Sequence, residues 1–164
     1  MRLRSAVMQP APDSLPFVDE HGVLIEAPPD AVWESLCRVA EGSFSAPLAS
    51  RFARLVGCES TEDSGPRPLA EGSSIPGFAV ARAVPGSELA LVGRHRYSEY
   101  ALLFRLAADG GATRVRAETR ARFPGASGRL YRAAVIGSRM HVLVTMRLLG
   151  AVKRRAESAA RRGS

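Results

Sequence analysis

Lysine and cysteine are almost absent from this sequence. Of the 23 basic residues among its 164, only Lys153 is a lysine, and this excess of arginine is typical of a GC-rich bacterial genome. Two cysteines, Cys37 and Cys58, form neither a C-x-x-C pair nor the dense framework of a small secreted domain. We therefore expect two buried thiols in a cytoplasmic, bacterial protein.

Long hydrophobic runs and targeting signals are also missing. No stretch reaches the roughly 20 uncharged apolar residues that a membrane span requires. The segment Met1–Ser14 mixes arginine, glutamine, proline and aspartate, so it lacks the apolar centre of a signal peptide. We expect a protein without a membrane span.

Motifs of several enzyme classes are absent as well. The sequence has no G-x-S-x-G nucleophile elbow, no phosphate-binding G-x-x-x-x-G-K-[ST] loop and no glycine-rich dinucleotide fingerprint. The histidines His21, His95 and His141 lack the spacing of zinc ligands. We therefore expect neither a metal nor a cofactor.

The composition that remains fits one globular domain. Hydrophobic residues make up 46% of the chain and charged residues 24%, and the net charge of +7 permits only weak attraction to nucleic acid or anionic lipid. Residues 1–20 are rich in proline and show no periodicity, which predicts a flexible N-terminal arm or an edge extension before a single domain at residues 21–160. The polar loop 57–74 is not a domain boundary, because neither side of it could form a core alone.

The most informative pattern lies in the last third of the chain. Residues 113–123 alternate strictly between small or apolar side chains and charged ones, and Pro124-Gly125 ends this pattern. An apolar stretch with helical periodicity and no proline follows, which predicts one unbroken helix over about Ser127–Ala156. A break near Gly137, or a parallel sheet, would argue against this prediction.

The remaining elements are shorter. A helix is expected after Pro28-Pro29, because proline is tolerated in a first helical turn, and a second one over Ala46–Val56. Turn residues at Pro85-Gly86 and Asp109-Gly110-Gly111 separate further strands. We predict these at residues 21–27, 78–84, 88–96, 97–107 and 113–123, with a short edge strand near the end of the loop 57–74.

This order resembles the helix-grip architecture of the START-like (SRPBCC) superfamily, which includes pollen-allergen-like and polyketide-cyclase-like proteins. The resemblance covers about Gly22 to Ala159 and rests on Ile25-Glu-Ala-Pro-Pro-Asp-Ala-Val-Trp33 and on Phe123-Pro-Gly125 before the long helix. The chain departs from the family at Pro28, where a serine or threonine cap is usual. The resemblance implies an α+β fold. A curved antiparallel sheet of six to seven strands would wrap around the C-terminal helix and enclose an apolar cavity, with two short helices after the first strand.

Helical phase predicts which side of the last helix faces the sheet. Small residues on that side either leave volume for a ligand or allow the helix to pack closely on bulky strand residues. His141 is the strongly polar group in the middle, and His95 alternates with inward residues of its strand, so both are either ligand contacts or satisfied core histidines. The predicted inward positions are Leu130, Ala134, Gly137, His141, Val144 and Leu148.

We expect the protein to bind a small apolar or amphipathic molecule between sheet and helix. His141, His95 and Arg82 would orient a polar end of that molecule. The expected lining residues are Trp33, Phe78, Tyr100, Phe104, Gly137 and Val144. Two alternatives stay open: a polyketide cyclase- or dehydratase-like enzyme with His141 or His95 as general base, and an interaction module.

Two further surfaces follow from the same patterns. A second seam on the last helix either covers the sheet edge and first strand or forms a homodimer; it consists of Val135, Val142, Met146 and Leu149. The outward face of the strand 113–123 carries Arg114, Arg116, Glu118, Arg120 and Arg122. Cross-strand pairing of arginine with glutamate explains this face, and its lack of aromatic side chains predicts no specific binding of nucleic acid.

Overall fold

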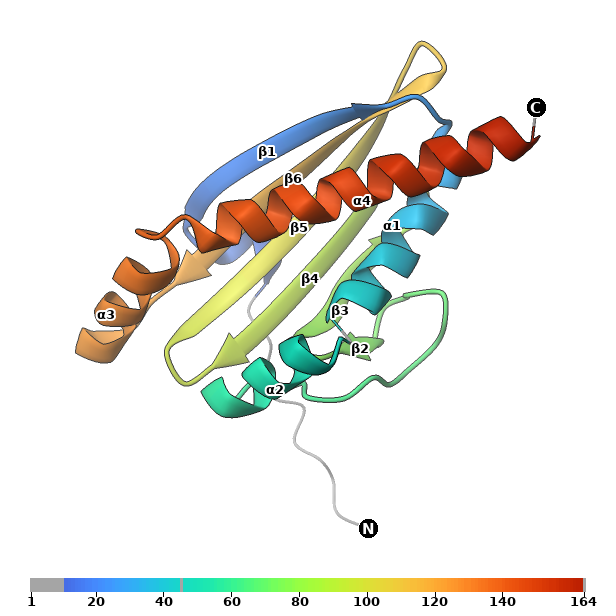
Figure 1. The fold of residues 1–164 in the computed structure, drawn as a ribbon. Coiled ribbons are helices and arrows are strands. Elements are labelled where there is room, and N and C mark those ends of the chain that lie inside the picture. Colours follow the sequence, from blue (N-terminus) through green and yellow to red (C-terminus); the bar gives the residue numbers. More distant parts are fainter. Residues whose placement is uncertain (1–10, 45, 164) are drawn as a thin grey trace.

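A computed structural model describes residues 11–44 and 46–163 of the chain. The described residues form a six-stranded antiparallel sheet with strand order β1-β6-β5-β4-β3-β2. All of the α-helices lie on its concave side, and the last of them crosses the sheet obliquely (Figure 1). The expected α+β helix-grip arrangement is confirmed.

Apart from the first strand and the C-terminal helix, the elements have bounds close to the expected ones. The helices are α1 (Pro29–Phe44), α2 (Pro47–Val56), α3 (Gly125–Val135) and α4 (Met140–Gly163), and a short 3₁₀ turn, η1, spans Pro12–Ser14. The strands are β1 (Phe17–Ile25), β2 (Ser74–Ile75), β3 (Phe78–Val84), β4 (Glu88–His95), β5 (Ser98–Asp109) and β6 (Ala112–Arg122).

The first strand begins earlier than the sequence analysis predicted. It starts at Phe17 instead of His21 and pairs with β6 along nearly its whole length. The predicted N-terminal arm therefore overlaps η1 and part of β1, while its residues 1–10 lie outside the described residues.

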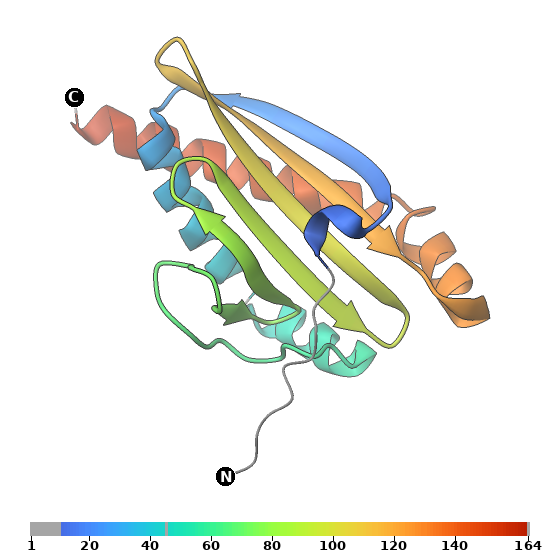
Figure 2. The ribbon, with the colours of Figure 1, turned by 180° about the vertical axis from the view of Figure 1, so that it is seen from behind.

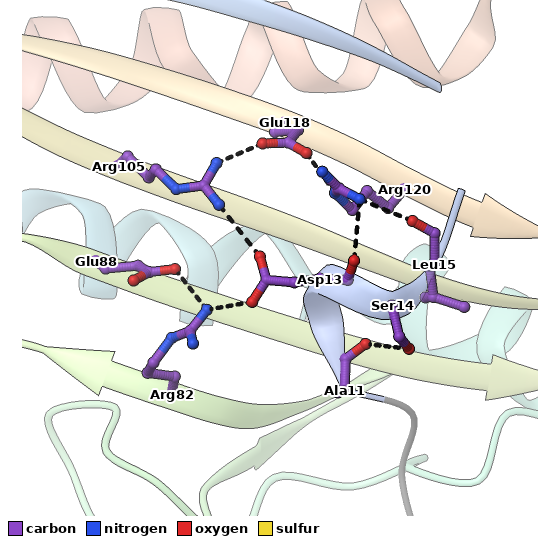
Figure 3. A network of polar contacts seen from close by, with 9 residues as sticks. All are labelled: Ala11, Asp13, Ser14, Leu15, Arg82, Glu88, Arg105, Glu118 and Arg120. Carbon is purple, nitrogen blue, oxygen red and sulfur yellow. Dashed lines mark hydrogen bonds and ion pairs between the residues drawn. The ribbon is translucent and has the colours of Figure 1, made fainter. Parts of the chain in front are cut away.

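Residues 13–15 are fixed on the outer face of the sheet, where η1 lies across the strands (Figure 2). Asp13 accepts hydrogen bonds from Arg82 at 3.0 Å and from Arg105 at 3.3 Å (Figure 3). Leu15 is buried there and covers a small second core made of Ala90, Val92, Ala101 and Leu103. This face is thus stabilised by both charge pairing and apolar burial.

The arginines of the outer face pair with carboxylates, as expected. Glu118 is buried between Arg105 and Arg120 and accepts hydrogen bonds from both (Figure 3). Burial alone would raise the pKa of Glu118, but these bonds outweigh it and hold the pKa below its ordinary value. Further pairs join Arg122 to Glu99 at 3.6 Å, Arg114 to Asp109 at 2.8 Å and Arg116 to Glu20 at 3.9 Å.

The prediction of one unbroken C-terminal helix was wrong. α3 ends at Val135, α4 begins at Met140, and the two axes differ by 54°. Glycine and serine are weak helix formers, and at the junction the Ser138 hydroxyl accepts the Met140 N–H at 3.4 Å while Arg139 adopts a left-handed φ of 59°. The fold is the expected one despite this break, so a break near Gly137 does not argue against the helix-grip arrangement.

The inward face of the last helix was also predicted incorrectly. Leu130, Ala134, Gly137 and Val144 are exposed, and counting 100° per residue from Leu130 no longer applies after the junction. The buried side chains of α4 are Thr145, Leu148, Leu149, Val152 and Ala156. Only Leu148 of the predicted stripe is fully buried, while His141 is partly buried.

The seam proposed for a homodimer is not a continuous exposed stripe. Leu149 is buried in the core, and Val135 and Val142 are partly buried, so only Met146 is largely exposed. The homodimer stays a prediction. The packing of α4 against β1 agrees with the alternative, in which this seam covers the sheet edge and first strand.

Candidate functional site

We call the space between the helices and the sheet the grip, and one half of it is closed because side chains fill it. Here Leu149, Val152 and Ala156 of α4 are buried against α1 and the sheet. Trp33 and Phe104, two of the predicted lining residues, belong to this packed core. They fill the interior tightly and therefore support the fold without lining an open site.

The other half lies where β4 ends and β5 begins, and its side chains are less buried. Aromatic rings follow one another across the concave face: Phe44 contacts Phe78 with centroids 4.7 Å apart, Phe78 contacts Tyr100 at 5.2 Å, and Tyr100 contacts His95 at 5.4 Å. The row continues from His95 to Tyr131 of α3 at 4.8 Å. All of these rings are partly buried.

Two more rings complete this row, which we call the aromatic cluster. Tyr97 stacks on Tyr131 with an interplanar angle of 20° and a centroid distance of 5.4 Å. Phe123 approaches Tyr131 at 6.4 Å. The aromatic cluster consists of Phe44, Phe78, His95, Tyr97, Tyr100, Phe123 and Tyr131.

A glycine on the neighbouring strand places Tyr100 within the aromatic cluster. Gly93 lies opposite Tyr100 in the β4–β5 pairing, and a Cβ there would come within 2.4 Å of the tyrosine ring. The ring lies over the bare backbone, and its hydroxyl donates a hydrogen bond of 2.6 Å to the Gly77 carbonyl. Burial raises the pKa of Tyr100, so this hydroxyl keeps its proton and the bond.

His95 is neutral and fully hydrogen-bonded. Its Nδ1 accepts the backbone N–H of Tyr97 at 3.1 Å, so the proton of the neutral ring sits on Nε2, which is 3.1 Å from the Ser98 hydroxyl. Burial lowers the pKa of His95 and keeps the ring uncharged. The sequence analysis placed His95 correctly on the concave face, as one of the rings of the aromatic cluster.

His141 lies at the edge of the grip, beside β1, and not in its middle. Its Nε2 is 2.7 Å from Asp19 Oδ2 and its Nδ1 is 3.3 Å from the Val135 carbonyl. Both partners are acceptors, so both bonds form only when the ring is an imidazolium. Burial alone would raise the pKa of Asp19, but hydrogen bonds, His141 foremost, outweigh it and lower that pKa.

The other predicted site residues lie apart from the aromatic cluster. Arg82 points to the outer face, because the register of β3 shifts between Val80 and Arg82, and it pairs there with Asp13 and with Glu88 at 2.8 Å. Its predicted contact with a ligand in the grip is therefore wrong. Gly137 is exposed at the junction of α3 and α4, and Val144 is 49% exposed on the first turns of α4.

Sequence reasoning missed four members of the aromatic cluster. Phe123 already shared a face with Ala121 in the strand alternation, but Phe44, Tyr97 and Tyr131 carried no comparable signal. Tyr97 lies in a two-residue turn, and Tyr131 fell outside the inward stripe because the phase of α3 was counted as one helix with α4.

The described residues offer no metal site, since no three histidine, cysteine, aspartate or glutamate side chains are placed to share an ion. Both cysteines are free thiols, and burial raises the pKa of Cys37 to about 11. Neither is therefore an activated nucleophile at neutral pH.

A hollow of about 300 Å³ opens in the loop after α2. Its walls are polar, with Glu59, Ser60, Thr61, Glu62, Ser64 and Ser74. It lacks the apolar walls typical of a small-molecule site, so the aromatic cluster is the stronger candidate.

Comparisons with known proteins concern the fold. No protein-family model and no curated protein matches the sequence. Similar solved structures include Ara h 8.0201, with 8% identity over 85% of this chain and 97% of that chain and a TM-score of 0.49. TTHA0849 from Thermus thermophilus has 16% identity over 85% and 97%, with a TM-score of 0.49. CalU16 from Micromonospora echinospora has 16% identity over 86% and 84%, with a TM-score of 0.48.

The chain has the helix-grip fold, as shown by the order and antiparallel pairing of its strands, with α1 and α2 after β1 and a long C-terminal helix across the concave face. Identities this low say nothing about a ligand.

Proposed function

We propose that the protein binds a small apolar or amphipathic molecule over the aromatic cluster. The observation that carries the proposal is the contrast between the two halves of the grip. In the closed half α4 fills the interior with Leu149, Val152 and Ala156, whereas the rings at the other end touch one another but remain partly exposed. A ligand laid on them would gain about 25 cal/mol for each Å² of apolar surface buried, before the costs of association.

Tyrosine hydroxyls supply polar contacts for one end of the ligand. Among the described residues no hydrogen bond involves the hydroxyl of Tyr97 or Tyr131, whereas that of Tyr100 already binds the Gly77 carbonyl. Burial raises the pKa of Tyr131, so its hydroxyl is a donor at neutral pH. A carbonyl or hydroxyl oxygen on an otherwise apolar molecule fits these donors.

The hydrogen bonds of the histidines favour binding over the cyclase-like alternative. A general base needs a free ring nitrogen within reach of the substrate. In His95 both nitrogens have partners, and in His141 both nitrogens lie against acceptors of the protein itself. Neither is poised to remove a proton.

Native mass spectrometry of freshly purified protein tests this proposal, because a co-purified ligand would appear as an added mass. Titration with the fluorescent probe anilinonaphthalene sulfonate gives an affinity for comparison among variants. Tyr131→Ala should weaken probe binding roughly tenfold, since it removes a ring that packs against three others. Phe17→Ala, an exposed aromatic on β1, is the matched control and should leave it unchanged.

Two results would refute the proposal. One is a protein that carries no ligand and binds no probe although circular dichroism shows it folded. The other is equal loss of probe affinity in Tyr131→Ala and Phe17→Ala, which would mean that the probe reports general apolar exposure.

A further inference from the structure

The arginines of this protein fall into two groups. Those on the sheet pair with carboxylates, as Arg82, Arg105 and Arg120 do. A second group lies on α2, on α3 and between the α3–α4 junction and Arg147; it is exposed and has no ion pair within residues 11–44 and 46–163. This unpaired group consists of Arg51, Arg54, Arg129, Arg132, Arg139 and Arg147.

Large apolar side chains are exposed beside these arginines on α2. Leu48 and Leu55 are each 80% exposed and Phe52 is 52% exposed. Their spacing of four and three residues places them on one face of the helix, while Ala53 and Val56 are buried on another. A basic helix with bulky apolar residues turned to solvent is typical of a segment that lies in a membrane interface.

The bend between α3 and α4 also combines exposed apolar side chains with arginine. Leu130, Met140 and Leu143 are exposed there, with Arg139 between the two helices. No single helix among the described residues is long and apolar enough to cross a membrane, and α3 and α4 reach that length and composition only as a bent pair. The apolar surface at the bend is that of the exposed leucine and methionine side chains.

Both surfaces lie at the same end of the molecule. The Arg96 N–H binds the Val56 carbonyl at the end of α2, at 3.4 Å, and Tyr97, the next residue, stacks on Tyr131 of α3. α2 and α3 thus flank one turn, the connection between β4 and β5 (Figure 1). Hereafter we call α2 and the α3–α4 bend, taken together, the basic apolar end.

We propose that the basic apolar end docks on the surface of an anionic lipid bilayer. No aspartate or glutamate occurs between Glu118 and Glu157 or within α2, so nothing in these segments offsets the arginines. Each arginine near an anionic surface strengthens attraction to it, and the leucine, methionine and phenylalanine side chains reach the acyl boundary. A second copy of the chain would bring unpaired arginines against unpaired arginines, and aliphatic side chains offer little to nucleic acid.

Sedimentation with vesicles tests the docking. The protein should bind vesicles of equal parts phosphatidylcholine and phosphatidylglycerol, and hardly bind phosphatidylcholine alone. Binding should weaken as salt is added, because the arginines are exposed and screened. The double variant Arg51→Gln/Arg54→Gln should lower the partition coefficient roughly tenfold or more, and Phe52→Ser should lower it several-fold.

Matched variants on the sheet control for charge and hydrophobicity. Arg114→Gln/Arg116→Gln removes the same charge from the outer face, and Phe17→Ser removes an aromatic ring of similar exposure. Both should bind vesicles like the wild type. Thermal melting of every variant shows whether it is folded, and all substituted side chains are exposed.

Several outcomes would overturn the proposal. Equal binding to both vesicle types, or equal losses in the sheet controls, would exclude docking by the basic apolar end. A wild-type dimer that becomes a monomer in Phe52→Ser, without vesicle binding, would assign the surface to a second copy. The vesicle experiment needs no ligand, so a negative result there leaves the proposed ligand binding untouched. A negative probe titration likewise leaves the proposed docking untouched.

Discussion

The imidazole ring of His141 joins the first turn of α4 to Asp19 of β1 and to the Val135 carbonyl at the end of α3. One ring thereby ties the bend between two helices to the edge of the sheet. These partners give His141 a role in the fold and leave neither ring nitrogen for a ligand. The sequence identified the residue as special but could not show that its partners come from β1 and from the helix junction.

Replacing His141 should therefore affect stability and not binding. His141→Leu removes the 2.7 Å contact to Asp19 and leaves the longer contact to His21, at 3.2 Å, and should cost about 1–3 kcal/mol of unfolding free energy. His21→Leu removes the longer of the two bonds and should cost less. Urea denaturation measures both, and the probe titration should remain within about twofold of wild type. Unchanged stability with lost probe binding would place His141 in the ligand site after all.

His95 provides a pH dependence whose sign follows from its burial. Because burial lowers its pKa in the folded protein, the unfolded chain takes up a proton first as the pH falls. Stability should then decrease below about pH 6.5, the ordinary histidine pKa, until the folded state is protonated as well. His95→Asn should flatten the difference in unfolding free energy between about pH 6.5 and pH 5. An equally steep dependence in that variant would assign the effect to other groups.

At the scale of elements, the strands were more predictable than the helices. β3 has the predicted bounds, because Pro85-Gly86 ends an alternating run and Gly86 adopts a left-handed φ of 71° in the turn. The C-terminal helix was not predictable in the same way. Apolar residues recur across Gly137 and Ser138 at near-helical spacing, so periodicity alone cannot reveal that the backbone turns there.

The aromatic cluster illustrates a second limit of the sequence. Tyr100 and Phe78 were expected because strand alternation places them on the concave face. Tyr131 joins them only because the bend sets α3 beside the β4–β5 turn, where Gly128 packs against the Tyr97 carbonyl. A contact between a helix and a turn depends on an angle between elements, and no local pattern encodes that angle.

The junction itself can be tested by a pair of glycine substitutions. Arg139 has a left-handed φ of 59°, which costs an L-residue roughly 1–2 kcal/mol, so Arg139→Gly should be neutral or stabilise by up to about 1 kcal/mol. Arg132 lies inside α3, where glycine should destabilise by up to about 1 kcal/mol. Both changes remove one exposed, unpaired arginine, and chemical denaturation compares them. Equal losses at the two positions would mean that the junction is not strained in solution.

At the scale of the molecule, the two sides of the sheet differ in whether their arginines are paired. The outer face carries paired charges and a small apolar core under η1, so its arginines are neutralised within the fold (Figure 3). The concave side holds the aromatic cluster, and the helices that flank it carry unpaired arginines and exposed apolar residues. Part of the positive charge of the chain thus lies unpaired at this end, where it can act on a partner.

The proposed binding site and the proposed membrane surface adjoin at this end, which makes a joint prediction. A bound apolar probe should leave the protein faster as anionic vesicles are added, because docking places the aromatic cluster next to the bilayer and spares the probe a passage through water. The measurement is the rate of probe transfer to vesicles at increasing vesicle concentration. In Arg51→Gln/Arg54→Gln this acceleration should disappear, while probe affinity in the absence of vesicles stays the same. A transfer rate independent of vesicle concentration in the wild type would show that probe release occurs in solution and that docking, where it occurs, serves another purpose.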